Sequence, residues 1–265
     1  MKLACVQFSP ALLDREETVR RLEPLLARCE GAELIVLPEL CNSGYNFADH
    51  RAAWEGAERL AGSPFLEYLT EQCGRLHCEI VTGLNERAGD RLYNSAVLVS
   101  RRGVEGVYRK LHLFMNEKDC FMPGDLGLPV FARPYGVIGM QVCFDWAMYE
   151  GWRVLALKGA ALICHPSCLV LPGKAQRAIP VYAMTNRMFI ATANRIGTEG
   201  ELTFTGSSLV ADPRGEIVAR ASETGEEVLT VEVDLGEARD KAVTARNDAF
   251  ADRRPSVYGE LCAEE

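Results

Sequence analysis

The sequence lacks a basic segment. Its 265 residues include 37 acidic and 29 basic side chains, which gives a formal net charge of −8 with no block of Lys and Arg. The phosphates of nucleic acids and the headgroups of anionic lipids both require clustered positive charge. We therefore expect neither nucleic acid nor a membrane surface among the partners of this protein.

Long hydrophobic runs are also missing. No apolar stretch approaches the ~20 residues that span a bilayer. The N-terminal "MKLACVQFSP" is a short strand-like run that ends at Pro10, too brief for the apolar core of a signal peptide. These absences predict a cytoplasmic protein.

The ten cysteines show no ladder of paired CxxC motifs. Cytoplasmic thiol buffers keep such cysteines reduced. We expect most of them to be buried as small hydrophobic side chains and one of them to take part in a reaction. Cys164, His165 and Cys168 suggest a metal site, but no further ligand stands at zinc-like spacing. One strand would also place Cys164 and His165 on opposite faces. We therefore expect no metal and no cofactor.

The sequence has no low-complexity linker and no short repeat, which favours a single domain over residues 1–265. Apolar, strand-like runs alternate with helix-like stretches at 15–30, 148–159 and 178–188. This alternation is typical of the α/β class.

Two groups of consecutive strands are expected, around 79–110 and 203–233. The tight turns at 102–103 and 212–215 would join neighbouring strands directly. Strands that follow one another through tight turns are antiparallel, so the pattern predicts mixed rather than purely parallel sheets.

Three reactive side chains stand at the ends of three strand-like runs. "LIVLPEL" places Glu39 after Pro38, "GVYRKLHLF" contains Lys110, and "YGVIGMQVC" ends at Cys143. In α/β proteins such ends carry sites, because a rigid sheet aims side chains that loops can surround. A solvated acid, a surface lysine and a core cysteine remain the alternative for each residue taken alone.

A thiol, a carboxylate and an ammonium group suit acyl transfer. The thiol is mostly protonated at neutral pH and needs a base, which a buried carboxylate can supply. The Lys110 ammonium and the backbone N–H of Phe144 would stabilise the oxyanion of a tetrahedral intermediate. No serine nucleophile motif and no Cys–His pair at a recognised spacing competes, so the substrate would be an amide or a nitrile.

The same stretches resemble the nitrilase (carbon–nitrogen hydrolase) superfamily. "LIVLPELCNSGY", "YRKLHLF" and "VCFDWAMYE" are similar to its three signature blocks, and "EKDCFMPGD", "HPSCLV" and "TGSSLVADPRGE" to later family segments. The resemblance implies a four-layer α-β-β-α sandwich with two mixed β-sheets, and a C-terminal tail from about 236. It also implies a homodimer or a larger even-numbered assembly.

For the site, the resemblance implies Glu39 as general base, Lys110 for oxyanion stabilisation and Cys143 as nucleophile of a thioester mechanism. Glu117 occupies the place of a second family glutamate, for substrate positioning or proton transfer, and is otherwise an exposed loop acid. Asp145 is expected to fix the turn after Cys143, because short acids bond nearby backbone N–H groups.

The residues after Cys143 bear on the substrate. True nitrilases of the superfamily read Cys-Trp-Glu where this chain has Cys-Phe-Asp, which favours amide hydrolysis. Relatives that act on N-carbamoyl amino acids or ω-amido acids tend to carry an arginine where this chain has Trp146 and Ala147. The sequence therefore predicts a small, neutral carboxamide as substrate. Arginine could still come from elsewhere, at Arg177, Arg187 or Arg195.

The pocket is expected to be aromatic. Trp146, Tyr45, Phe114 and Phe121 would line an acyl pocket or lie in the core. The backbone of Ser167 or Cys168 is expected to touch the substrate. Nitrilase, N-carbamoyl and ω-amidase activities remain alternatives for the same residues, and a catalytically silent binding protein or a redox-sensing thiol are alternatives of other classes.

Overall fold

The computed structural model describes residues 1–263 and contains two large mixed sheets. In the first, β1 runs parallel to β2 and β2 to β3, while β14, β4 and β5 are antiparallel to their neighbours. Its strands, in spatial order, are β14 (Glu227–Glu232), β1 (Lys2–Gln7), β2 (Leu34–Val36), β3 (Glu79–Ala88), β4 (Arg91–Ser100) and β5 (Gly103–Arg109).

The second sheet has the same mixture of directions. Its strands β7, β8 and β9 are parallel, and β6, β12 and β13 are antiparallel to their neighbours. In spatial order they are β13 (Ile217–Arg220), β12 (Leu209–Ala211), β9 (Phe189–Asn194), β8 (Leu162–Ser167), β7 (Gly136–Met140) and β6 (Val130–Arg133). The prediction of mixed sheets is confirmed.

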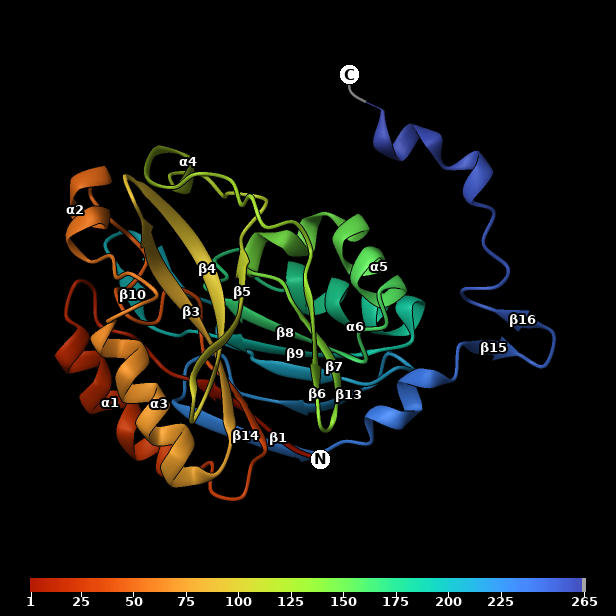
Figure 1. The fold of residues 1–265 in the computed structure, drawn as a ribbon, viewed down its shortest axis with the longest axis horizontal. Helices are drawn as coiled ribbons and strands as arrows, with labels where there is room; N and C mark the ends of the chain where they lie inside the picture. Colours follow the sequence, from red (N-terminus) through yellow and green to blue (C-terminus); the bar gives the residue numbers. More distant parts are fainter. Residues whose placement is uncertain (264–265) are drawn as a thin grey trace.

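Helices cover the outer face of each sheet (Figure 1). On the first sheet lie α1 (Arg15–Ala27) and α3 (Pro64–Leu76), and on the second lie α5 (Tyr149–Leu157) and α6 (Lys174–Asn186). One apolar cluster fills the space between the sheets, a second lies under α1 and α3, and a third under α5 and α6. Burial of these three apolar layers provides the main driving force for this arrangement. The predicted α-β-β-α sandwich is confirmed.

The sequence located the helices better than it located the strand ends. Helix α1 begins after Asp14, whose carboxylate accepts the backbone N–H of Glu17, as the sequence stretch 15–30 predicts. Strand β2 has only three residues, and β7 ends at Met140. The prediction that Cys143 ends a strand is therefore wrong, because Gln141 and Val142 separate it from β7.

The other elements are short. The helices α2 (His50–Glu55) and α4 (Glu117–Cys120) contact each other at one end of the sandwich (Figure 1). The remaining elements are β10 (Thr198–Glu199), β11 (Leu202–Thr203), β15 (Ala242–Thr244), β16 (Asn247–Asp248) and the 3₁₀ turns η1 (Cys143–Ala147), η2 (Leu235–Arg239), η3 (Pro255–Val257) and η4 (Gly259–Cys262).

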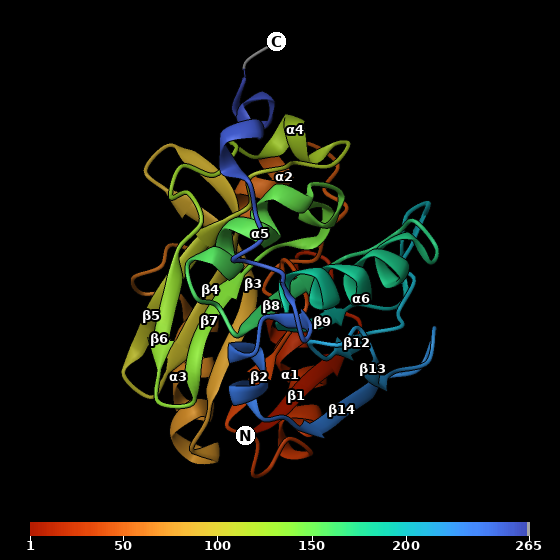
Figure 2. The same ribbon diagram turned by 90° about the vertical axis from the view of Figure 1, so that its right-hand side faces the viewer.

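The segment after η2 extends away from the sandwich (Figures 1 and 2). It is drawn in blue and carries β15, β16, η3 and η4, and most of its residues are exposed. Within residues 1–263 no helix combines the length and the apolar character needed to cross a membrane.

Candidate active site

Glu39 lies in a loop that is bonded to the edge of β3. The N–H of Gly83 donates to the carbonyl of Pro38 (3.0 Å), and the N–H of Cys41 donates to the carbonyl of Gly83 (3.1 Å). A Cβ at position 83 would lie 2.3 Å from the Cα of Glu39. Only a glycine at position 83 lets the loop lie this close to β3. Gly83 therefore fixes the position of the Glu39 backbone.

A buried cluster of charges surrounds Lys110, the first residue after β5. Its Nζ donates to Oε1 of Glu39 and to Oε1 of Glu117, both at 2.7 Å. Asn94 Nδ2 donates to the same Glu39 oxygen (2.7 Å), and the Tyr45 hydroxyl donates to the same Glu117 oxygen (2.6 Å). All five side chains are buried, so these charge-assisted bonds lie in a region of low dielectric constant.

The cluster contains two carboxyl groups but one ammonium. Burial alone would lower the pKa of Lys110, but Glu117 and Glu39 raise it well above its usual value, so the ammonium stays charged. Burial also raises the pKa of Glu117, and the neighbouring Glu39 adds to this effect while Lys110 opposes it. Oε2 of each acid has no hydrogen-bond partner among the described residues. Each acid therefore has one oxygen free for a substrate or a water.

Cys143 adopts a strained backbone conformation at the start of η1. Its φ is +42°, in the left-handed region that residues with a side chain rarely occupy. The carboxylate of Asp145 accepts the N–H of Val142 (2.8 Å), and the N–H of Asp145 donates to the carbonyl of Val142 (3.0 Å). The prediction that Asp145 fixes this turn is confirmed.

His165 holds the same turn from β8. Its Nε2 lies 2.9 Å from the carbonyl oxygen of Cys143, and its Nδ1 lies 3.0 Å from the hydroxyl of Thr192. Burial lowers the pKa of His165 to about 4, so the ring is neutral at pH 7. Because a carbonyl oxygen only accepts, Nε2 carries the proton and Nδ1 accepts from Thr192.

The Cys143 thiol faces the charged cluster. Burial raises its pKa well above the usual value, Glu39 raises it further, and Lys110 acts in the opposite direction. Glu117 also contributes to this electrostatic environment. The thiol is therefore protonated at rest and needs a base before it can act as a nucleophile.

Two cavities adjoin the cluster and share Phe114 in their walls. The narrow one, about 10 Å³, reaches the thiol and has room for about one water. Its walls include Cys143, Phe144, Trp146 and Cys168. The wide one, about 400 Å³, reaches Glu117. Its walls are formed by Tyr45, Asn46, Phe47, Phe114, Met115, Asn116, Glu117, Cys120, Phe121, Gly200, Glu201 and Leu202.

Most of the residues that the sequence singled out come together here, but some do not. Ser167 is buried, its hydroxyl lies near His165, and it lines neither cavity. Arg195 is paired with Glu199 instead of facing a substrate, and Arg187 bonds the carbonyls of Pro213 and Asp240. The exposed Arg177 of α6 also lines neither cavity.

The rival metal site is not assembled. Cys164 packs between the two sheets, whereas His165 points the other way and packs edge-on against Trp152. Among residues 1–263 no three His, Cys, Asp or Glu side chains are grouped so that they could hold a metal ion.

Sequence reasoning missed several residues that build the site. Asn94, which bonds Glu39, is a polar residue inside the apolar run "YNSAVLVS", and that exception was the available signal. Tyr108 and His112 also went unnoticed. The Tyr108 hydroxyl and the His112 ring nitrogen Nδ1 both lie 2.7 Å from the carboxylate of Asp145, which ties the segment around Lys110 to the turn of Cys143.

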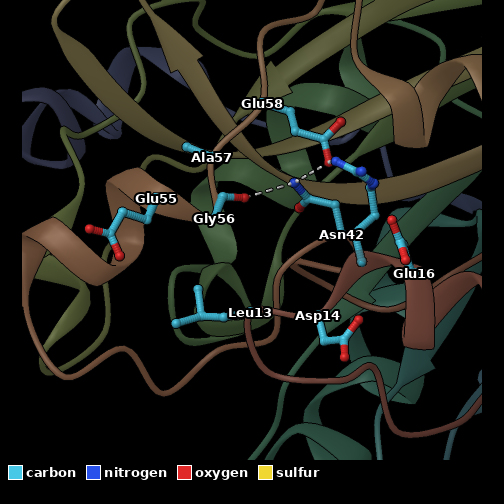
Figure 3. Close-up of a pocket in the computed structure, with 9 residues that line it drawn as sticks. Leu13, Asp14, Glu16, Asn42, Glu55, Gly56, Ala57 and Glu58 are labelled. Atoms are coloured by element: carbon cyan, nitrogen blue, oxygen red, sulfur yellow. Dashed lines mark hydrogen bonds and ion pairs between the residues drawn. The ribbon is translucent and has the colours of Figure 1, made fainter.

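A further hollow, of about 280 Å³, lies outside the loop that carries Glu39 (Figure 3). Asn42 points into it and donates to the carbonyl of Gly56 (3.3 Å) and to Glu58 (3.4 Å). The side-chain oxygen Oδ1 of Asn42 accepts the backbone N–H of Asn85 (2.8 Å). Neither the thiol nor the Lys110 cluster lines this hollow. The hydrogen bonds of Asn42 hold the loop that carries Glu39 in place.

Comparison with known proteins gives a consistent family assignment. A family model described as "Carbon-nitrogen hydrolase" matches residues 2–242. A protein named nitrilase from Pyrococcus abyssi is 44% identical over 260 residues, covering 97% of this chain and 99% of the relative. An N-carbamoylputrescine amidase from Oryza sativa is 31% identical, covering 97% of this chain and 93% of the relative.

A solved structure has the same fold. It is a carbon-nitrogen hydrolase from Helicobacter pylori G27, which is 26% identical and superimposes with a TM-score of 0.86. The match covers 100% of this chain and 99% of the other. The similarity therefore extends over both sheets and over the loops that carry the site.

Proposed function

This chain belongs to the carbon–nitrogen hydrolase family, and from that premise we propose that it hydrolyses a small, neutral carboxamide to a carboxylic acid and ammonia. The proposed route is a thioester on Cys143. The observation that carries the proposal is the convergence of a thiol, an ammonium and two carboxyl groups in one buried cluster.

In the first half of the proposed reaction, Cys143 attacks the amide carbonyl. The free Oε2 of Glu39 accepts the thiol proton as the C–S bond forms. The Lys110 ammonium and the N–H of Phe144 stabilise the oxyanion. Glu39 then delivers the proton to the departing nitrogen, and ammonia leaves as the C–N bond breaks.

In the second half, water hydrolyses the thioester. The water oxygen attacks the acyl carbon while Glu39 accepts a proton from the water. Glu39 then passes this proton to the departing sulfur. Glu117 shares the Lys110 ammonium with Glu39 and lines the wide cavity, which supports a role for its free oxygen in orienting the amide or the water.

The preference for a neutral substrate rests on the walls of the wide cavity. They contain aromatic, apolar and amide side chains and two acids, but no Lys or Arg. A substrate carboxylate would meet Glu117 and Glu201 without a counter-charge, which would cost binding free energy. Tyr45, Phe114 and Phe121 offer apolar surface for a short acyl chain.

Nitrile hydrolysis is the second candidate, because the relative with 44% identity is named a nitrilase. The same thiol can add to a nitrile carbon to form a thioimidate. One water then releases the nitrogen as ammonia and leaves a thioester, and a second water hydrolyses that thioester to the acid. The segment Cys-Phe-Asp at 143–145 favours the amide.

The deciding experiment compares matched substrates. Purified protein is incubated with propionamide, propionitrile and succinamate, and ammonia release is measured together with the mass of the Cys143 peptide. We expect turnover of propionamide, a propionyl adduct on Cys143, and at least tenfold lower kcat/KM for the other two compounds. Faster turnover of succinamate would overturn the neutral-substrate proposal, and faster turnover of propionitrile would favour the second candidate.

We also propose that two copies pair through their outer helices. Leu157 of α5 and Val181 and Met184 of α6 are large, exposed apolar residues on the same outer face. Light scattering should give twice the mass of the chain or an even multiple of it, and a monomer at micromolar concentration would contradict this. The ten free thiols support a reducing, cytoplasmic location.

A further inference from the structure

Glu199 binds the loop that carries Tyr45. Its Oε2 accepts the backbone N–H groups of Tyr45 (3.0 Å) and Asn46 (2.7 Å), and its own carbonyl accepts the side-chain amide of Asn46 (2.8 Å). The carboxylate is buried and comes from β10, more than 150 residues further along the chain. Two adjacent N–H groups on one carboxylate oxygen fix the direction of the loop backbone.

Arg195 in turn holds Glu199. Its guanidinium pairs with Oε1 of Glu199 and donates to the Ser9 hydroxyl (3.2 Å) and the Pro10 carbonyl (3.3 Å). The guanidinium also lies 4.0 Å from the ring centroid of Phe204. Arginine forms such multidentate and stacked contacts with little freedom left, so it fixes the carboxylate in place.

The pair reaches the candidate active site through Tyr45. The Phe204 ring stands edge-on to the Tyr45 ring, with 5.8 Å between centroids. The Tyr45 hydroxyl donates to the Glu117 oxygen that also accepts from Lys110. The backbone of Tyr45 is therefore held by Glu199, and the hydroxyl of the same residue donates a hydrogen bond to Glu117.

Gly44 shows how closely the loop approaches the pair. Its φ is +76°, and a Cβ there would lie 2.8 Å from Oε1 of Glu199 and 2.7 Å from the Cα of Leu12. The loop thus reaches the carboxylate only because residue 44 has no side chain.

We propose that Glu199, held by Arg195, is a positioning residue that aims the Tyr45 hydroxyl at Glu117 and thereby sets the proton balance of the active site. This inference rests on the proposed function, because it assigns Glu117 a part in amide turnover. Neither Glu199 nor Arg195 lines the cavity at the thiol, so both act through Tyr45.

The test uses Glu199→Gln, Glu199→Asp and Tyr45→Phe. The Asp variant keeps a charge opposite Arg195 but is one methylene shorter, so it weakens the bonds to the loop while the ion pair supports folding. We expect kcat to fall ~10- to 100-fold in each variant with a smaller change in KM, the size typical of a misplaced catalytic group. Because Glu199 acts through the Tyr45 hydroxyl, the double variant Glu199→Gln/Tyr45→Phe should be no slower than Tyr45→Phe alone.

The pH profile separates positioning from a merely structural role. The Tyr45 bond lowers the pKa of Glu117, so losing it should move the limb of the kcat profile that follows Glu117 to higher pH. All three variants should show the same direction of shift. Glu79→Gln is the matched control, because Glu79 is also a largely buried acid paired with an arginine, Arg133, but lies at the start of β3, away from the site. It should leave kcat and the pH profile unchanged.

A readout without turnover keeps the two proposals apart. The rate at which iodoacetamide alkylates Cys143 is measured against pH by peptide mass spectrometry. If wild-type protein hydrolyses no amide but the variants still shift this alkylation profile, the proposed function fails and the positioning role stands. If folded Glu199→Asp retains the wild-type kcat and both wild-type pH profiles, or if the effects of Glu199 and Tyr45 are additive, the positioning role is overturned.

Discussion

The two halves of the sandwich share one strand pattern but contribute different chemistry. In the order β14-β1-β2-β3-β4-β5, successive pairs are antiparallel, parallel, parallel, antiparallel and antiparallel. The order β6-β7-β8-β9-β12-β13 shows the same succession. The N-terminal half is the sheet that contains β1–β5 and β14, and its strands lead to the acids and the lysine. The central half is the sheet that contains β6–β9, β12 and β13, and its strands lead to the thiol.

The halves also hold their groups by different means. In the N-terminal half the charged side chains bond one another, so Lys110 stabilises two buried carboxyl groups that would otherwise be costly. In the central half the thiol is placed by its backbone, through the strained turn that Asp145 and His165 hold. Charge pairing fixes one half and backbone geometry fixes the other.

The largest expected effect on activity follows removal of the Cys143 thiol. We expect Cys143→Ser to lower kcat for amide hydrolysis by about 10⁴-fold or more, the scale seen for loss of a nucleophile. The serine fits the same turn, so thermal unfolding should be nearly unchanged. Cys262→Ser is the control, since that thiol is exposed. Appreciable residual ammonia release by Cys143→Ser would contradict the role of the central half.

Removing the ammonium tests the charge pairing of the N-terminal half. Lys110→Met should reduce kcat by at least ~10²–10³-fold, as for loss of one oxyanion donor. It should also lower the free energy of unfolding by about 3–5 kcal/mol at pH 7, because two buried carboxyl groups lose their partner. Urea unfolding and ammonia release measure the two effects, with the exposed Lys174→Met as control. Near-normal turnover would refute the assignment.

The contribution of the neutral His165 ring, which bonds the carbonyl of Cys143, to the free energy of unfolding should depend on pH. Because the pKa of His165 is about 4 in the folded chain and near 6.5 when unfolded, its contribution to stability is present above pH ~6.5 and is lost as the pH falls to ~4. Wild-type protein should lose about 3 kcal/mol more than His165→Gln over this range, since one pKa unit is worth about 1.4 kcal/mol. The glutamine amide can replace the Nε2 donor.

Urea unfolding at several pH values between 4 and 7 measures this difference. His50 is exposed, so His50→Gln should follow the wild type. If His165→Gln loses stability in acid as steeply as the wild type, the neutral buried ring is not the group responsible.

The smallest expected effect concerns a bond that joins the halves. The Tyr108 hydroxyl, at the end of β5, donates to Asp145 (2.7 Å). Tyr108→Phe should lower the free energy of unfolding by about 1–2 kcal/mol and kcat by less than tenfold, because Asp145 keeps its other donors. Tyr68→Phe is the matched control, since the buried Tyr68 hydroxyl has no partner among the described residues. Equal losses in the two variants would show that the bond between the halves contributes nothing.

The sequence predicted the mixed sheets and the segments that carry Glu39, Lys110 and Cys143, because apolar periodicity and short motifs are local properties. The four layers were implied by the resemblance to the nitrilase superfamily. The sequence misjudged the end of β7, because Gln141 and Val142 belong to the strand-like run "YGVIGMQVC" but follow the last residue of the strand, Met140. It also suggested Arg195 as a source of charge for the substrate, but Arg195 is paired with Glu199.

The sequence by itself determined the kinds of group that this protein brings to its site: a thiol, an amine and two acids at recognisable positions. Only the tertiary structure decided their partners. Asn94 meets Glu39 across 55 residues, and Tyr45 meets Glu117 across 72. Such contacts depend on how the strands of the first sheet and the loops that follow them lie in space, and no local pattern of residues encodes the distance between atoms that the chain separates so widely.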